Sequence, residues 1–138
     1  MKLDDLDIAI LKELKSNSKL TFKEIGEKLH LTGQAVGNRV NKLIENNIIE
    51  NFTININKNY LGLKNTSYVR IYMKDNSHDK ILNIINKHDE IVEAYKTGSD
   101  CCYILKIENE SNESLTSLLD EILPFANYQI SMVLDRIK

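Results

Sequence analysis

The first fifty residues carry apolar side chains at intervals of three and four, the spacing of helices with one buried face. Three such stretches occur, each preceded by a residue that caps helices well: Asp4, Thr21 and Thr32. Glu24 follows Thr21 by three residues, which is the pattern of a capping box. After the third stretch comes Asn47, a residue that tolerates left-handed backbone. The apolar positions are Leu6, Ile10, Leu11 and Leu14, then Ile25 and Leu29, then Val36, Val40 and Leu43.

From residue 65 the pattern changes to short runs of β-branched and aromatic residues that alternate with helical stretches. Strands are predicted over 66–73, 91–97, 102–107 and 128–137, and helices over 80–87 and 115–123. Residues 48–57 also alternate and predict a wing or a linker strand. The sequence therefore predicts an α+β protein, in which an N-terminal winged helix-turn-helix precedes a ferredoxin-like β-α-β-β-α-β domain. The expected parts are residues 1–51, a linker strand over 52–64, and residues 65–138.

Two of the predicted strands, 66–73 and 102–107, carry apolar residues on both faces, including Tyr68, Tyr72 and Ile104. Two helices cover only one face of a four-stranded sheet. An uncovered apolar face is a liability on a monomer. We therefore expect the second face of the sheet to be buried against the sheet of another subunit.

The second and third predicted helices, joined by a three- or four-residue turn, have the proportions of a helix-turn-helix. In that motif the N-terminal residues of the second helix reach base edges in the major groove. Here the outward side chains are small and rich in amides, and Asn or Gln can bind adenine through two hydrogen bonds. Arg or Lys can bind phosphate or guanine. The predicted contacts with double-stranded DNA are Thr32, Gly33, Gln34, Ala35, Asn38, Arg39 and Lys42.

Several segments resemble the Lrp/AsnC family, the leucine-responsive and asparagine-linked regulators. They are residues 3–7 (LDDLD), 25–29 (IGEKL), 31–32 (LT) and 35–43 (AVGNRVNKL), followed by Glu45, Ile48 and Ile49. That family pairs a winged helix-turn-helix with a β-α-β-β-α-β domain that assembles dimers and binds amino acids. The resemblance covers nearly the whole chain. It implies a sequence-specific transcription regulator that responds to an amino acid or similar small effector, as a homodimer that assembles further to a tetramer or octamer.

The resemblance also points to the turn between the second and third strands of the C-terminal half, where the family carries Gly, two residues and Asp-Tyr. Gly98 and Tyr103 match, with one extra residue between them, and Cys102 stands where an acid is common. Glycine lets backbone amides approach a ligand carboxylate, and Asp100 can meet its ammonium group. The alternative is a plain β-hairpin with two buried thiols. The expected effector residues are Thr97, Gly98, Ser99, Asp100 and Cys101.

Composition changes this picture little. The chain has 138 residues, 42% hydrophobic and 28% charged, which is ordinary for globular domains. Its net charge is −2, and residues 1–51 carry eight basic and eight acidic side chains, so charge gives DNA binding no support. We see no apolar leader and no run near the roughly 18 apolar residues of a membrane span. We therefore expect a cytoplasmic protein without a membrane partner.

Other functions find less support in the sequence. The three histidines lie away from nucleophiles and carboxylates at catalytic or metal-ligand spacing, and the five glycines are scattered. We expect no catalysis, no cofactor and no metal, and we expect Cys101 and Cys102 to be reduced packing residues. Two alternatives stay open. One is an architectural protein that wraps DNA with little sequence preference and no effector, and the other is an effector-binding module that has lost DNA binding.

Overall fold

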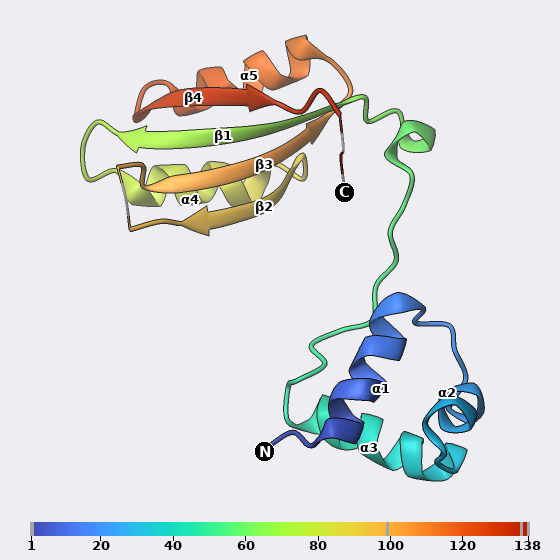
Figure 1. The fold of residues 1–138 in the computed structure, drawn as a ribbon. Helices are drawn as coiled ribbons and strands as arrows, with labels where there is room; N and C mark the ends of the chain where they lie inside the picture. Colours follow the sequence, from blue (N-terminus) through green and yellow to red (C-terminus); the bar gives the residue numbers. More distant parts are fainter. Residues whose placement is uncertain (1, 99, 136, 138) are drawn as a thin grey trace. The chain divides into compact units, whose positions relative to one another are not determined.

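A computed structural model describes residues 2–98, 100–135 and 137, and divides the chain into two compact units, residues 1–55 and 56–138 (Figure 1). The first unit holds the three predicted helices, α1 (Asp5–Ser16), α2 (Phe22–Leu29) and α3 (Gly33–Glu45). The predicted caps are confirmed, because side-chain oxygens of Asp4, Thr21 and Thr32 accept from the backbone N–H three residues later. Each such cap contributes about 1 kcal/mol to helix stability.

The core of this helical unit consists of the inward positions of the three helices. Ile10, Leu14, Ile25, Val36 and Val40 are buried together, with Leu20, Leu29, Leu31 and Ile49 packed around them. Asn47 has a φ of 54°, so the predicted left-handed residue after α3 is confirmed. The chain then turns back, because the N–H groups of Ile48 and Ile49 both donate to the Leu43 carbonyl.

The structure has no strand over 52–64, where the linker strand was predicted. Residues 50–57 are irregular, and in the described part of the chain no strand precedes residue 65. Apolar and polar residues do alternate here, but a strand also needs a hydrogen-bonding partner, and the helical unit supplies none. A short 3₁₀ helix, η1 (Lys58–Leu61), follows and ends at Gly62, whose φ is 75°.

The second unit has the predicted β-α-β-β-α-β order. Its elements are β1 (Asn65–Met73), α4 (His78–Lys87), β2 (Ile91–Lys96), β3 (Tyr103–Asn109), α5 (Asn112–Ile122) and β4 (Ala126–Met132). The strands lie in the order β2-β3-β1-β4, and every neighbouring pair is antiparallel. Both helices cover the same face of the sheet (Figure 1). The ferredoxin-like fold is therefore confirmed, although β4 ends five residues before the predicted position 137.

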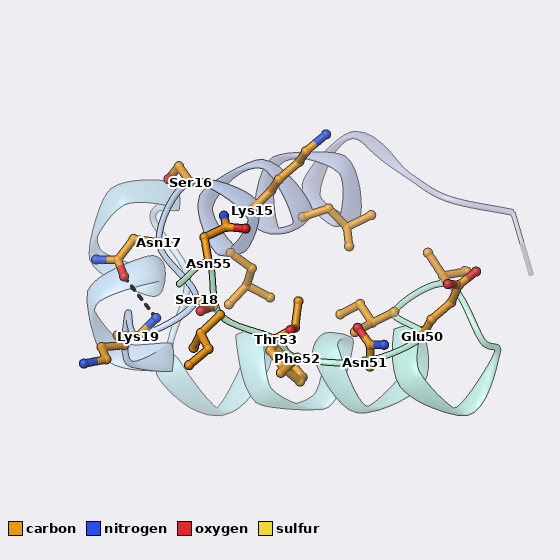
Figure 2. A pocket seen from close by; sticks show the side chains of 15 residues that line it. Lys15, Ser16, Asn17, Ser18, Lys19, Glu50, Asn51, Phe52, Thr53 and Asn55 are labelled. Atoms are coloured by element: carbon orange, nitrogen blue, oxygen red, sulfur yellow. Dashed lines mark hydrogen bonds between the residues drawn. The ribbon is translucent and has the colours of Figure 1, made fainter. Parts of the chain in front are cut away.

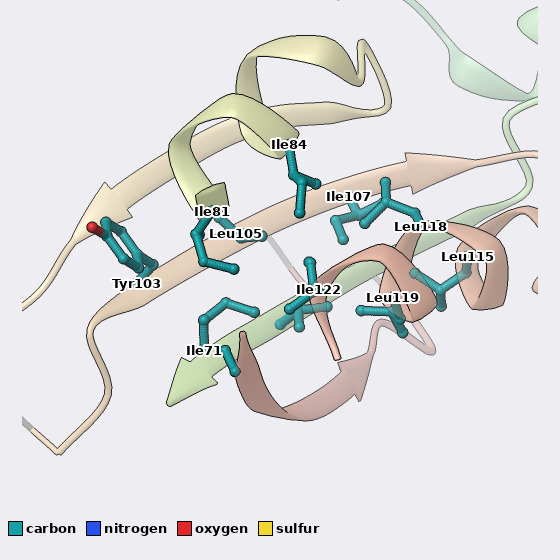
Figure 3. Close-up of a cluster of buried hydrophobic side chains, with 12 residues drawn as sticks. Ile71, Ile81, Ile84, Tyr103, Leu105, Ile107, Leu115, Leu118, Leu119 and Ile122 are labelled. Atoms are coloured by element: carbon teal, nitrogen blue, oxygen red, sulfur yellow. The ribbon is translucent and has the colours of Figure 1, made fainter. Parts of the chain in front are cut away.

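The core of the second unit lies between that face and the two helices (Figure 3). Ile71 of β1, Leu105 of β3 and Ile122 of α5 are fully buried. Each such side chain contributes about 1.5–3 kcal/mol by leaving water. No helix among the described residues is long and apolar enough to cross a membrane.

Candidate functional site

In the turn between α2 and α3, the backbone of residue 31 lies very close to Gly26 of α2. His30 ends α2 with a left-handed φ of 57°, and the Leu31 N–H donates to the Gly26 carbonyl at 2.8 Å. A Cβ on Gly26 would lie 2.5 Å from the Leu31 oxygen, so this geometry requires glycine. Sequence reasoning did not single out Gly26, and its signal was a glycine inside a helix, where that residue is normally unfavourable.

The helix α3 presents one buried face and one polar face. Val36, Val40 and Leu43 are buried in the helical unit. On the opposite side Gln34, Asn38 and Asn41 are exposed at i, i+4 and i+7. Of the residues predicted to contact DNA, the structure exposes Thr32, Gln34, Asn38 and Lys42 and leaves Gly33, Ala35 and Arg39 half-buried. The amide of Asn41 lies on the same strip.

Arg39 is directed to the side of α3 and bonds the start of α1. Its Nη1 lies 2.7 Å from Asp4 Oδ2 and 2.7 Å from Asp7 Oδ1. Only 3% of the Asp7 side chain is exposed, so this carboxylate depends on a nearby cation. The hydrogen bonds that Arg39 donates to Asp4 first and to Asp7 second raise the pKa of Arg39. The pKa of Asp4 is lowered, chiefly by the Asp7 backbone N–H and then by Arg39. The guanidinium predicted to meet DNA therefore joins α3 to α1.

A groove of about 870 Å³ lies between the end of α1 and residues 48–55 (Figure 2). Leu11 and Leu14 contribute apolar surface, and Asn17, whose Oδ1 accepts from the Lys19 N–H at 3.0 Å, contributes to its polar rim. The hinge, which we define as residues 50–57, borders it. Phe52, Ile54 and Ile56 of the hinge are 55%, 72% and 52% exposed. The sequence showed their alternation but not that they would lie exposed.

The hairpin between β2 and β3 contains the predicted effector residues. Ser99 lies outside the described residues. The Thr97 hydroxyl donates to the Cys101 carbonyl, and the Thr97 N–H donates to the Cys102 carbonyl at 3.0 Å. Gly98 and Asp100 are exposed, and a Cβ on Gly98 would meet nothing within 4 Å. Cys101 is buried, so its thiol supports the hairpin from inside.

His78 and Tyr103 support the hairpin at its base. His78 Nδ1 and Tyr103 Oη lie 2.8 Å apart, which joins the start of α4 to the start of β3. Burial raises the pKa of Tyr103. Sequence reasoning noted Tyr103 but missed its partner, since 25 residues separate them. Among the described residues, no group of three His, Cys, Asp or Glu side chains could hold a metal ion.

The face of the sheet away from the helices is open, with Tyr68 and Ile104 on it as predicted and charged side chains beside them. Lys106 Nζ lies 2.6 Å from Glu93 Oε1, and this contact raises the pKa of Lys106 and lowers that of Glu93. Glu108, which is nearly buried, pairs with Lys58 of η1. These four charges are thus paired within one chain, so a second surface can cover them at lower cost.

Comparison with known proteins matches both units. An AsnC-type helix-turn-helix domain corresponds to residues 3–44 and an Lrp/AsnC ligand binding domain to residues 66–138. The HTH-type transcriptional regulator LrpB of Bacillus subtilis is 39% identical over 138 residues, covering 100% of this chain and 93% of its own. LrpA of the same organism is 38% identical over 135 residues, covering 97% of this chain and 99% of its own.

Solved structures agree with these sequence matches. Bacillus subtilis LrpC superposes with a TM-score of 0.93 at 30% identity, over 100% of this chain and 99% of its own. A transcriptional regulator from Neisseria meningitidis, solved as a complex with L-Met, shares the fold with a TM-score of 0.90 at 20% identity, over 99% of this chain and 93% of its own. The helix-turn-helix, the ferredoxin-like unit and the full-length relatives all place this chain in the Lrp/AsnC family of transcriptional regulators.

Proposed function

We propose that the protein is a cytoplasmic, sequence-specific DNA-binding regulator that inserts α3 into the major groove and responds to an amino acid or similar small effector. The observation that carries this proposal is the exposed amide strip on α3, opposite its buried face. Such a strip can reach base edges, whereas phosphate contacts would fall to residues at its margins. We assign DNA contact to Thr32, Gly33, Gln34, Ala35, Asn38 and Lys42, with Arg39 holding the helix in place.

Fluorescence anisotropy tests this assignment on the DNA upstream of the protein's own coding region. We expect a specificity ratio of order 10³ or more over unrelated DNA. Gln34→Ala should reduce that ratio, because it removes a base contact. Lys42→Ala should weaken binding to all sequences alike. Equal affinity for related and unrelated DNA would refute sequence-specific reading and support the architectural alternative.

The effector site that we propose is the β2–β3 hairpin, with Thr97, Gly98 and Asp100 facing the ligand and Cys101 behind them; the predicted Ser99 lies outside the described residues. Open space around Gly98 and the exposed Asp100 carboxylate support this proposal. An amino acid offers a carboxylate for backbone amides and an ammonium group for Asp100. The Neisseria meningitidis relative, solved with L-Met, suggests the same class of ligand.

Calorimetry against the twenty amino acids tests the hairpin. Asp100→Ala and Gly98→Val should each weaken binding of the ligand found. Glu110→Ala, an exposed acid just beyond β3, is the matched control and should bind as the parent does. If a ligand binds the parent, Asp100→Ala and Gly98→Val with equal affinity, its binding site lies elsewhere in the protein.

We further propose a homodimer in which two open sheet faces pack together, with tetramers or octamers built from such dimers. The tyrosines and Ile104 on this face, together with the ion pairs Lys106–Glu93 and Lys58–Glu108, support that packing. Light scattering should give twice the 15.9 kDa of one chain, or a multiple of that. Tyr68→Lys should dissociate the dimer, whereas Tyr60→Lys, at a highly exposed position on η1, should leave it intact. A monomeric parent at micromolar concentration would refute the proposal.

A further inference from the structure

We propose that α3 reads adenine, so that the base pairs it contacts in each half-site are A·T pairs. This inference rests on the proposed DNA-binding function and specifies its substrate. It follows from which side chains the structure leaves free on α3 and which it engages elsewhere.

The free side chains on the strip are carboxamides. Gln34, Asn38 and Asn41 are exposed at i, i+4 and i+7, so they lie on one side of α3. At 1.5 Å per residue they extend over about 10 Å of the helix axis. That length is comparable to three base-pair steps of roughly 3.4 Å. One strip can therefore address neighbouring bases in the major groove.

The usual reader of guanine is missing from this strip. Arg or Lys binds guanine O6 and N7 in the commonest specific contact. On α3, however, Arg39 is held by Asp4 and Asp7 at the side of the helix. Lys42 lies beside the strip near the C-terminal end of α3, and the residue that continues the strip is the acidic Glu45. The part of α3 that enters a groove first presents no cation.

A carboxamide discriminates between the two purines. Its NH₂ group donates to adenine N7 while its oxygen accepts from adenine N6, so both ends are satisfied. Guanine presents two acceptors, N7 and O6, and the amide oxygen then faces an acceptor without a hydrogen. A polar group left unpaired in a desolvated contact costs free energy, so this strip favours adenine.

The test replaces adenines of the protected region upstream of the protein's own coding sequence with 7-deazaadenine, one position at a time. This base keeps its pairing with thymine but lacks the N7 acceptor. We expect about a tenfold loss of affinity at each contacted adenine, the effect of one good base contact. Replacement of guanines with 7-deazaguanine should change affinity less than about twofold.

Variants connect the loss to particular side chains. Gln34→Ala, Asn38→Ala or Asn41→Ala should bind the parent operator more weakly and lose the sensitivity to 7-deazaadenine at one position. Lys42→Ala is the matched control, which should keep that sensitivity while lowering the salt dependence of binding. Sensitivity to 7-deazaguanine instead of 7-deazaadenine would overturn the inference and leave DNA binding intact. Failure to bind any form of this DNA would overturn the proposed function together with it.

Discussion

Replacement of Arg39 by Gln should destabilise the helical unit and leave the salt dependence of DNA binding unchanged. The change removes the cation that lies 2.7 Å from Asp7 and 2.7 Å from Asp4. An exposed ion pair contributes up to about 1 kcal/mol, whereas removing one partner of a buried pair costs about 3–5 kcal/mol. Asp7 is nearly buried but Arg39 is 30% exposed, so the loss lies between these limits, about 2 kcal/mol. The half-exposed pair with Asp4 adds little.

The loss of unfolding free energy can be measured on the full chain by urea unfolding, with the helical circular dichroism signal as the readout. Asp7→Asn and the double variant complete a mutant cycle, which should show that the two losses are not additive. Lys42→Ala, exposed on the same helix, is the stability control. In titrations of DNA binding against salt, a phosphate contact contributes about 0.9 to the slope. If Arg39→Gln lowers that slope by about one and leaves the unfolding free energy unchanged, Arg39 binds phosphate and the anchoring role is refuted.

Three further predictions concern other parts of the chain. Gly26→Ala places a methyl group against a backbone oxygen 2.5 Å away and should lower the free energy of unfolding by about 1–3 kcal/mol, measured in urea; an unchanged midpoint would refute the close contact. Leu105→Ala, at a fully buried position, should lower the free energy of unfolding by about 2–5 kcal/mol in the same assay. Glu121 has a lowered pKa, chiefly because of Lys87 and then His88. Its stabilising effect is therefore present above the unfolded pKa near 4.5 and is lost as pH falls through the lower folded value. Glu121→Gln should make acid unfolding less steep in that range, and an identical pH profile would contradict this.

Local signals in the sequence were sufficient for much of the fold. Thr21 and Glu24 form their capping box because three residues of helix bring them together whatever the rest of the chain does. Asn47 takes its left-handed conformation for a similarly local reason. The order of elements in the second unit also followed, because the alternation of helices and strands permits few arrangements.

Contacts between distant residues could not be predicted in this way. Arg39 and Asp7 are 32 positions apart, and the pattern of α3 alone does not show which of its polar side chains meets another helix. Lys58 and Glu108 are 50 positions apart. A strand was predicted in the hinge because its apolar and polar residues alternate. Alternation shows only which side chains share one side of an extended segment, whereas a strand forms only beside another strand to which it can hydrogen-bond.

The pair between Lys58 and Glu108 ties η1 to β3, so the second unit holds the chain from residue 58 onward, and the hinge before it contains no helix or strand. Eight residues span at most about 28 Å when fully stretched. In the proposed dimer, two hinges of this reach would let the reading helices meet half-sites whose separation differs by part of the roughly 34 Å turn of DNA. Binding sites of one regulon then need not share a constant spacer. An alignment of promoter sequences that assumes a fixed distance between half-sites would therefore conceal the shared motif. An alignment of the individual half-sites would reveal it.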